Sequence, residues 1–328
     1  MSRAWHLKSR PSGLPTQENF ELREVDLPPL GEGQVRVRNL WLSVDPYMRG
    51  RMNEVKSYVP PFQVGEPLEG GAIGEVVESR QEGLKAGDLV QHMSGWRDEA
   101  ILPPRTANKL PELGFPPQLY LGVLGVTGVT AYFGLLDAAR AKEGDIVFVS
   151  AAAGAVGSVV VQIAKAKGMK VIASAGGPEK CKWVLSLGAD EVVDYKAGPI
   201  LKQLAAAAPD GIDVYFDNVG GDHLDAAFAL ARNNARFAIC GMIEGYNDPS
   251  PKSFKFIQRV IAARIMIKGF LVLDYYPRIA EFYGEMGPWM KNGAVKSRET
   301  VVDGLEHAPD AFLGLFRGEN MGKMLVKL

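Results

Sequence analysis

A glycine-rich turn between an apolar strand and a helix constrains this chain more than any other feature. Residues 145–150 (DIVFVS) have the composition of a buried strand, residues 152–157 (AAGAVG) supply the glycines, and a helical run follows at 156–167. This is an A-x-G-x-x-G variant of the dinucleotide-binding fingerprint, in the strand–turn–helix setting that the fingerprint requires. We expect Gly154 to let the backbone approach a pyrophosphate and Gly157 to let the helix pack closely on the strand. The alternative is a tight turn that binds no ligand.

Short apolar runs alternate with helical stretches from about residue 120 onward. Strands are expected at 170–174, 191–194, 212–217, 235–240 and 266–272, and helices at 178–187, 200–207 and 224–231. Continuous apolar strands that alternate with helices indicate a parallel sheet covered on both faces. This context favours the dinucleotide interpretation of the glycine turn.

The N-terminal third predicts strands and loops instead. Residues 34–38, 70–78 and 87–91 read as strands, and frequent prolines disfavour long helices. An all-β, barrel-like module is the simplest account. The last residues, 324–328 (MLVKL), also look like a strand, which we expect to return to this module.

Length and charge exclude several classes of protein. The 328 residues are about twice a typical domain of ~150 residues, so two domains are expected. Lys plus Arg number 37 and Asp plus Glu 38, a net charge of −1 that gives no bulk attraction to nucleic acid or an anionic membrane. The two cysteines, Cys181 and Cys240, argue against a disulfide framework. The four histidines are scattered, which argues against a zinc site or any other metal site of such ligands.

Neither a secretory signal nor a membrane span is expected. The N-terminal residues lack the apolar core of a signal peptide. Two uncharged stretches, 113–136 and 146–164, are long enough to span a membrane, but glycines and prolines interrupt the first and the glycine turn divides the second. We therefore expect a cytoplasmic protein.

The end of the second strand indicates which dinucleotide the turn would take. NAD sites place an acidic side chain there to hold the ribose hydroxyls. Here residues 174–177 read SAGG, without a carboxylate. Lys180, at the start of the next helix, and Tyr195, at the end of the third strand, are candidates to hold a 2′-phosphate, and ordinary surface residues are the alternative. We therefore favour NADP.

Further motifs, in their order along the chain, resemble those of the medium-chain dehydrogenase/reductase superfamily. They are DPYMR at 45–49, GVLGVTGVTAYFGLL at 122–136, VSAAAGAVG at 149–157, FDNVGG at 216–221, CGMIEGYN at 240–247 and GENMGK at 318–323. Within the superfamily the chain looks like the zinc-independent branch of prostaglandin reductases, leukotriene 12-hydroxydehydrogenases, alkenal double-bond reductases and curcumin reductases.

The resemblance covers essentially the whole chain and implies a fold. A GroES-like β-barrel domain would comprise residues 1–120 and 296–328. A Rossmann domain with a doubly wound parallel sheet, residues 121–295, would be inserted into it, making the chain an α/β protein. NADPH as the cofactor and a homodimer are also implied.

The resemblance implies a set of cofactor contacts as well. The pyrophosphate would lie on Ala153, Gly154, Ala155, Val156 and Gly157, and the 2′-phosphate on Lys180 and Tyr195. The ribose and nicotinamide would be lined by Asn218, Cys240, Gly241, Met242, Tyr246, Phe270, Leu271 and Val272, with a further contact from Asn320. The sequence departs from the pattern in two places. Gly177 stands where many relatives carry Ser, and Val126-Thr127, next to the expected nicotinamide pocket, stands where many carry Met-Pro or Met-Thr.

The expected lack of zinc ligands bears on the reaction. Alcohol oxidation in zinc enzymes uses the metal to acidify the hydroxyl, whereas a C=C bond conjugated to a carbonyl is already activated. We therefore predict an NADP-dependent oxidoreductase that reduces the C=C bond of α,β-unsaturated aldehydes and ketones by hydride transfer to the β-carbon. The enolate that results needs a hydrogen-bond donor.

Two tyrosines are candidate catalytic residues. Tyr246 lies in a loop that follows a strand at its carboxyl end, where its phenol can donate to the enolate or relay a proton to the α-carbon. Tyr47 is the second candidate, because relatives with the DPYM motif use it to line the substrate pocket. The alternatives are an aromatic cover over the nicotinamide for Tyr246 and a packing residue for Tyr47. Arg49 and Arg51 are expected in a solvated loop, or as attractors of an acidic substrate group.

Two other functions remain open from the sequence. One is an NADPH:quinone oxidoreductase of the same superfamily, which also lacks zinc. The other is an NADPH-binding sensor with little catalytic activity, although the complete glycine turn and the two tyrosines count against it.

Overall fold

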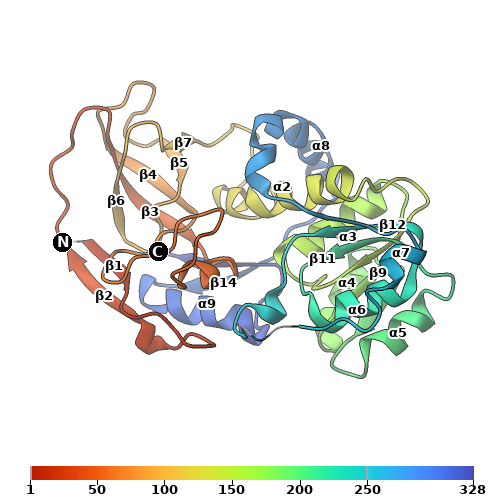
Figure 1. The fold of residues 1–328 in the computed structure, drawn as a ribbon. Coiled ribbons are helices and arrows are strands. Elements are labelled where there is room, and N and C mark those ends of the chain that lie inside the picture. Colours follow the sequence, from red (N-terminus) through yellow and green to blue (C-terminus); the bar gives the residue numbers. More distant parts are fainter. Residues whose placement is uncertain (1, 249, 251) are drawn as a thin grey trace. The chain divides into compact units, whose positions relative to one another are not determined.

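The computed structural model describes residues 2–248, 250 and 252–328. The chain divides into two compact units, Met1–Leu121 with Glu299–Leu328, and Gly122–Arg298. In Figure 1 the first unit carries the strands labelled β1 to β7, and the second carries most of the labelled helices. The second unit is thus inserted into the first along the chain.

A six-stranded parallel sheet forms the centre of the Gly122–Arg298 unit. Its order is β10-β9-β8-β11-β12-β13, and each neighbouring pair is parallel. The strands are β8 (Ile146–Val149), β9 (Lys170–Ala175), β10 (Glu191–Asp194), β11 (Ile212–Asp217), β12 (Ala231–Ile239) and β13 (Met266–Gly269). The strand order reverses between β8 and β11, and sheets of this kind bind their ligands at such a point.

Helices precede, connect and follow these strands along the chain. They are α2 (Val126–Phe133), α3 (Ala155–Ala166), α4 (Pro178–Ser186), α5 (Ile200–Ala207), α6 (Gly221–Leu230), α7 (Arg259–Ala262) and α8 (Ile279–Lys291), with short helical turns η3 (Gly134–Ala138), η4 (Ile243–Gly245) and η5 (Val272–Arg278). Right-handed crossovers in the two directions from the reversal place helices on opposite faces of the sheet. This doubly wound α/β fold confirms the fold class that the strand–helix alternation predicts.

The last strand is shorter than the sequence suggests. We expect a strand over 266–272, but β13 ends at Gly269, and Val272 already belongs to η5. The final pair in its ladder is Ile239 with Gly269. Because β12 ends at Ile239, the edge strand has no partner beyond this point and the chain leaves the sheet.

The other unit is a barrel-like module of mainly antiparallel strands. One sheet has the order β14-β15-β3-β4-β5-β7 with β6 paired to β3, and β1 pairs with β2. The strands are β1 (Ser2–Leu7), β2 (Phe20–Val25), β3 (Val35–Ser43), β4 (Ala72–Ser79), β5 (Leu89–His92), β6 (Glu99–Leu102), β7 (Asn108–Lys109), β14 (Glu299–Asp303) and β15 (Lys323–Lys327). Strand β15 lies antiparallel to β3, with Val326 opposite Leu42. The tail therefore returns to the N-terminal module, as its sequence predicts.

Residues from both ends of the chain build one core in this unit. The Phe20 ring stacks on Trp96 with centroids 5.9 Å apart, and Phe312 of α9 (Ala308–Arg317) meets both edge-on. Met48 and Met324 belong to the same buried cluster. The DPYMR segment and the tail strand therefore pack against a common core.

The two long uncharged stretches do not form long helices. Residues 113–136 divide into η2 (Pro117–Leu121), α2 and η3, and residues 146–164 divide into β8 and α3. Within residues 2–248, 250 and 252–328, no helix has both the length and the hydropathy that crossing a membrane requires.

Candidate functional site

The glycine turn lies at the point where the strand order reverses. It follows β8, passes Ala151 with a φ of +47°, and enters α3 at the N-cap residue Gly154, where no side chain caps the helix. The first amides of a helix have no intrahelical acceptor. Together with the positive end of the helix dipole, they form an anion-binding site at the carboxyl end of β8.

Close packing of the turn depends on Gly157. A Cβ atom there would lie 2.4 Å from the carbonyl oxygen of Ala151 and 2.8 Å from Cα of Ala152, which are main-chain atoms. At Gly154 the nearest atom is the same carbonyl oxygen, at 3.2 Å. Gly157 therefore lets α3 pack on the turn, and the cradle fits the pyrophosphate of a dinucleotide.

Asn218 joins the ends of β8 and β11. Its side-chain amide donates to the carbonyl oxygen of Ser150 at 2.8 Å, and its backbone N–H donates to Ser150 Oγ at 2.9 Å. Its carbonyl oxygen accepts a hydrogen bond from the N–H of Ile243 at 3.3 Å. This residue thus lies between the glycine turn and the loop that carries Tyr246.

Asp217, which the sequence analysis missed, is the polar centre of this strand end. Its carboxylate is fully buried, and Oδ1 accepts hydrogen bonds from the Tyr215 phenol at 2.7 Å, the Gly220 N–H at 2.8 Å, the Val219 N–H at 2.9 Å and the Ser150 hydroxyl at 3.3 Å. Burial raises the pKa of the Asp217 carboxyl, although these donors oppose the rise. The signal available in the sequence was a carboxylate that ends the apolar strand IDVYFD.

The loop that carries Tyr246 is held by the same residue. The N–H groups of Cys240 and Gly241 donate to the carbonyl oxygen of Asp217 at 2.9 and 3.0 Å. The Tyr246 phenol oxygen accepts from the N–H of Met242 at 3.4 Å, and a Cβ atom on Gly241 would lie 3.0 Å from it. Burial raises the pKa of the Cys240 thiol to about 12, so the thiol is neutral at pH 7. The loop therefore places Tyr246 close to the ends of β11 and β12.

Lys180 and Tyr195 follow β9 and β10, at the same edge of the sheet. A Cβ atom on Gly176 would lie 2.5 Å from the Tyr195 phenol oxygen, so the ring lies over this glycine. Burial lowers the pKa of Lys180, and the nearby charge of Lys196 lowers it further. Lys196 carries no recognisable pattern in the sequence and was missed. Two ammonium groups that repel each other favour the binding of an anion between them.

The tip of β9 is neutral. Ser174 Oγ lies 2.9 Å from Nε2 of His223, and both side chains are buried. Burial lowers the pKa of His223 to about 4, so its imidazole is uncharged at pH 7. Gly177 has a φ of +91°, which favours glycine over the serine of many relatives. The strand therefore presents no carboxylate of its own where NAD sites carry one.

Phe270 is a packing residue at the end of β13. Its ring meets Phe216 edge-on at 6.2 Å, and a Cβ atom on Gly134 would lie 2.4 Å from its Cζ. Leu271 and Val272, which follow it, are half-buried.

Tyr47 and Asn320 belong to the other unit. Tyr47 precedes α1 (Met48–Arg51) and is half-buried. Its side chain packs against the buried cluster that contains Met48 and Met324. Burial, assisted by the charge of Asp45, raises its pKa, so the phenol stays protonated. The Asn320 side chain donates to the carbonyl oxygen of Gly322 at 2.9 Å, a local turn contact.

Arg49 and Arg51 are not in a solvated loop, so that expectation is wrong. Arg49 is 3% exposed and donates to the carbonyl oxygen of Gly13 at 2.7 Å. Arg51 is 9% exposed, donates to Glu69 at 2.8 Å and lies 4.0 Å from the centre of the Phe62 ring. Both side chains have structural roles, because their aliphatic parts are buried and their guanidinium groups bind to other segments of the protein.

The described part of the chain contains no group of three or more His, Cys, Asp or Glu side chains that could hold a metal ion. His92 is buried, which lowers its pKa to about 3, and its Nδ1 accepts from the N–H of Ser94 at 3.1 Å.

Comparison with known proteins identifies the family. The family described as "N-terminal domain of oxidoreductase" matches residues 3–110, and the one described as "Zinc-binding dehydrogenase" matches residues 155–291. The chain is 44% identical to the NADPH-dependent curcumin reductase of Escherichia coli (100% of this chain, 97% of the relative). It is 41% identical to the NADP(+)-dependent 2-alkenal reductase of Nicotiana tabacum (98% and 95%).

A solved structure agrees. The crystal structure of CurA from Vibrio vulnificus in complex with NADPH has a TM-score of 0.94 and 44% identity, and the match covers 99% of this chain and 98% of that one. Together with the sheet order and the glycine turn, these likenesses show that the chain belongs to the NADP-dependent branch of the medium-chain dehydrogenase/reductase superfamily that includes curcumin reductase and 2-alkenal reductase.

Proposed function

We propose that this protein reduces the C=C bond of α,β-unsaturated aldehydes and ketones with NADPH. The observation that carries the proposal is the meeting of the glycine turn, Asn218 and the Tyr246 loop at the ends of β8, β11 and β12. The relatives named above act on curcumin and 2-alkenals, both of which contain a C=C bond conjugated to a carbonyl.

When bound, NADPH supplies the hydride that is added to the β-carbon. The chain supplies binding groups, which we assign to Ala153, Gly154, Ala155, Val156, Gly157, Lys180, Tyr195, Asn218, Cys240, Gly241, Met242, Tyr246, Phe270, Leu271, Val272 and Asn320. Tyr246 donates a hydrogen bond to the enolate oxygen or relays a proton to the α-carbon. Tyr47 is the second donor, and its raised pKa keeps its proton available at neutral pH.

Lys180→Ala is expected to raise the Kd for NADPH about tenfold, because a charged hydrogen bond to the 2′-phosphate is lost. The Kd for NADH, which has no 2′-phosphate, should change little. Lys182→Ala, two residues along the same helix, is the control. Fluorescence titration of the parent protein and both variants with both nucleotides measures the six dissociation constants. Equal weakening of NADPH and NADH would contradict the phosphate assignment.

The reaction is proposed to be independent of zinc. A C=C bond conjugated to a carbonyl is already activated, so the addition of hydride to it needs no metal ion. Dialysis against a chelator should leave enone reduction unchanged, and loss of activity that zinc restores would overturn the proposal.

We further propose that the protein is cytoplasmic, in keeping with its unpaired Cys181 and Cys240.

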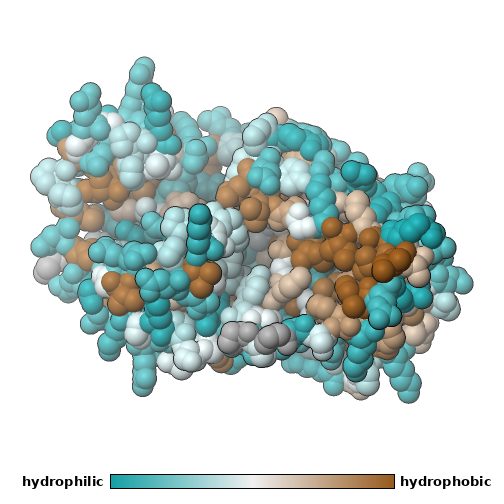
Figure 2. Space-filling model, in the orientation of Figure 1, coloured by the Kyte–Doolittle hydropathy of each residue, from teal (hydrophilic) through white to brown (hydrophobic). Residues whose placement is uncertain are grey.

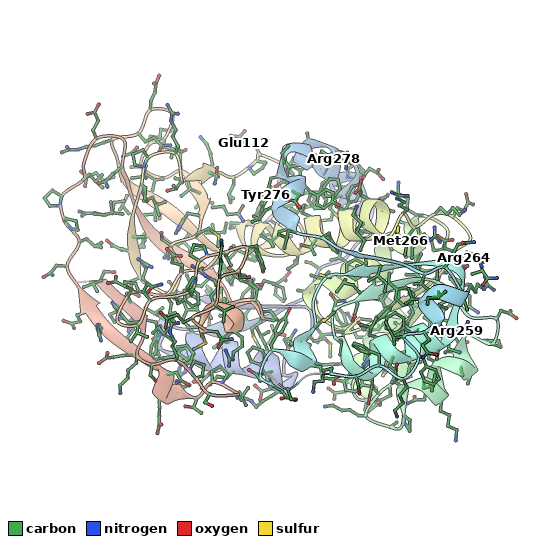
Figure 3. The ribbon with its side chains drawn as sticks, viewed as in Figure 1. Glu112, Arg259, Arg264, Met266, Tyr276 and Arg278 are labelled. Carbon is green, nitrogen blue, oxygen red and sulfur yellow. The ribbon has the colours of Figure 1, made fainter. Side chains whose placement is uncertain are left out.

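We propose that the protein is a homodimer that pairs through the edge strand β13. Ile261 is 83% exposed and Ile267, on β13, is 43% exposed. Figure 2 shows apolar side chains gathered over the part of this unit that Figure 1 labels α7, and Figure 3 labels Arg259, Arg264 and Met266 there. The opposite edge strand, β10, begins and ends with the acidic residues Glu191 and Asp194, which discourage pairing. A second copy pairs with β13 in a closed two-fold arrangement.

Ile267→Lys is therefore expected to convert the dimer to a monomer, because it places a charge on the pairing strand. Val301→Lys, on the edge strand β14 of the other unit, should leave the dimer intact. Light scattering after size exclusion gives the mass of each variant. A wild-type monomer at micromolar concentration would contradict the homodimer.

The function itself is tested by the loss of NADPH absorbance with a small enal, a bulky aryl enone and a quinone, with NADH in parallel. Enone-dependent oxidation of NADPH that yields the saturated aldehyde or ketone supports the proposal, and the size preference ranks substrates. Turnover of the quinone alone would assign the protein to the quinone oxidoreductases. Binding of NADPH without turnover of any acceptor would favour a sensor.

A further inference from the structure

A buried lysine connects the tail of the chain to the DPYMR segment. Lys323, the first residue of β15, is 4% exposed. Its Nζ donates to the carbonyl oxygen of Val44 and to Oδ1 of Asp45, both at 2.9 Å. Burying an ammonium group costs much free energy unless it is paired and hydrogen-bonded, as this one is. Two motifs that lie at opposite ends of the chain, DPYMR and GENMGK, therefore meet at one ion pair.

Asp45 is held on both of its carboxylate oxygens. Oδ1 accepts from Lys323, and Oδ2 accepts from the hydroxyl of Ser43. Its carbonyl oxygen accepts from the N–H of Met48 at 3.1 Å, which starts the short helix α1. The direction in which the chain enters this turn is therefore set at Asp45, and Pro46 and Tyr47 are the two central residues of the turn.

The Tyr47 ring is half-buried and packs against the cluster that contains Met48 and Met324. On the far side of the turn, Arg49 is anchored to the carbonyl oxygen of Gly13 at 2.7 Å and to Oδ1 of Asn53 at 2.7 Å. Before the turn, the chain is anchored by the ion pair of Asp45 with Lys323, whose Nζ lies 2.9 Å from Oδ1.

We propose that Lys323 is a positioning residue, which fixes the Asp45 turn so that Tyr47 presents its phenol to the substrate. The inference rests on the proposed role of Tyr47 as a donor in enone reduction. Lys323 does not touch the reacting atoms, and its effect passes through Asp45.

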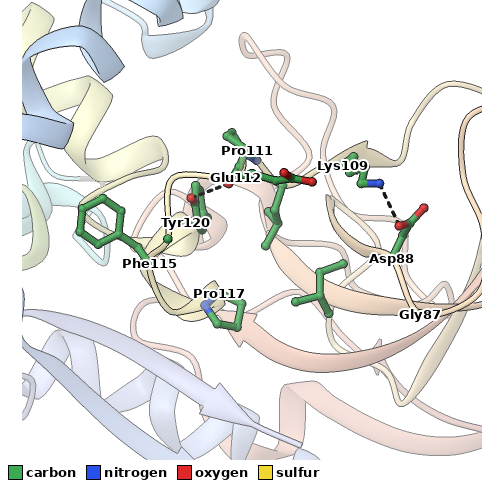
Figure 4. A pocket seen from close by; sticks show the side chains of 11 residues that line it. Gly87, Asp88, Lys109, Pro111, Glu112, Phe115, Pro117 and Tyr120 are labelled. Atoms are coloured by element: carbon green, nitrogen blue, oxygen red, sulfur yellow. Dashed lines mark hydrogen bonds and ion pairs between the residues drawn. The ribbon is translucent and has the colours of Figure 1, made fainter.

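Lys323→Met keeps an unbranched side chain of nearly the same length and removes its charge. We expect kcat for an enone to fall about tenfold, because a catalytic group displaced by less than 1 Å loses much of its effect. The Kd for NADPH should not change. The matched control is Lys109→Met, which breaks the ion pair of Lys109 with Asp88 at 2.9 Å in the same unit (Figure 4) and should leave both constants unchanged. Thermal unfolding shows whether each variant is folded, and Asp45→Asn serves in the same test if Lys323→Met is not.

Combination with Tyr47→Phe separates the inference from the proposed function. If Lys323 acts through Tyr47, the double variant is as slow as Tyr47→Phe alone. If the two losses multiply, Lys323 acts elsewhere and the inference is overturned. If Tyr47→Phe keeps full enone reduction, the donor role of Tyr47 is wrong and the inference fails while the reductase activity stands.

A crystal structure of Lys323→Met shows the position of the Tyr47 ring independently of any activity measurement. We expect the ring of Tyr47 to be displaced or present in several conformations, while β3 and β4 superpose on the parent. A Tyr47 ring in its original place would overturn the inference even if the protein reduced no enone.

Discussion

Tyr246→Phe is expected to lower kcat for an enone about a hundredfold, the usual loss when one hydrogen-bond donor to a developing oxyanion is removed. The aromatic ring remains in its loop, and only the phenol oxygen, which accepts from the N–H of Met242 at 3.4 Å, is removed. The Kd for NADPH should therefore change little. The loss of NADPH absorbance gives kcat, and fluorescence titration gives Kd.

Tyr276→Phe is the control for this substitution. Tyr276 is a tyrosine of the same unit, 41% exposed, on η5 (Val272–Arg278), and it should keep full activity without its hydroxyl (Figure 3). Unchanged turnover in Tyr246→Phe would remove this residue as the donor. A selective loss in Tyr47→Phe would then assign the donor to Tyr47.

Gly157→Ala is expected to destabilise the protein by about 1–3 kcal/mol, the usual cost of inserting a methyl group where main-chain atoms leave no room. The added Cβ would lie 2.4 Å from the Ala151 carbonyl oxygen, so α3 must move away from the turn. The amides at its start then no longer point at the pyrophosphate, and NADPH binding should weaken about tenfold, or ~1.4 kcal/mol. Denaturant unfolding and NADPH titration measure the two effects.

Gly154→Ala separates these two effects. Its Cβ would come no closer than 3.2 Å to the protein, so the unfolding free energy should change by less than in Gly157→Ala. NADPH binding should still weaken, because the methyl group occupies the approach of the pyrophosphate. If Gly154→Ala destabilised the apoprotein as much as Gly157→Ala does, the division between a packing glycine and a binding glycine would be wrong.

Periodicity and turn chemistry made the fold class predictable. The strand at 212–217, the helix at 200–207 and the glycine turn between 150 and 157 depend on residues that are adjacent in the chain. The end of β13 was misjudged because it depends on Ile239, which is paired with Gly269 in the ladder but lies thirty residues earlier in the chain. Arg49 and Arg51 were misjudged because the carbonyl and carboxylate groups that bury them come from other segments.

The candidate site likewise contains residues that the sequence indicated and residues that only the structure revealed. The motifs indicated the glycine turn, Asn218 and the CGMIEGYN loop, and the structure brings these three together at the ends of neighbouring strands. Asp217 was passed over although it stands beside Asn218, because nothing in IDVYFD shows that four donors converge on one of its oxygens. Lys196 was missed because its effect on Lys180 depends on the adjacency of β9 and β10.

By itself, the sequence determined the α/β class, the place of the dinucleotide turn and the family, because these are properties of local spacing and of motifs read in order. The tertiary structure alone decided which polar groups are paired. The ammonium of Lys323 and the carboxylate of Asp45 are 278 residues apart, yet their atoms lie 2.9 Å apart. A buried charge is stable only with its partner, and that partner is chosen by the pairing of β15 with β3, which no local pattern contains.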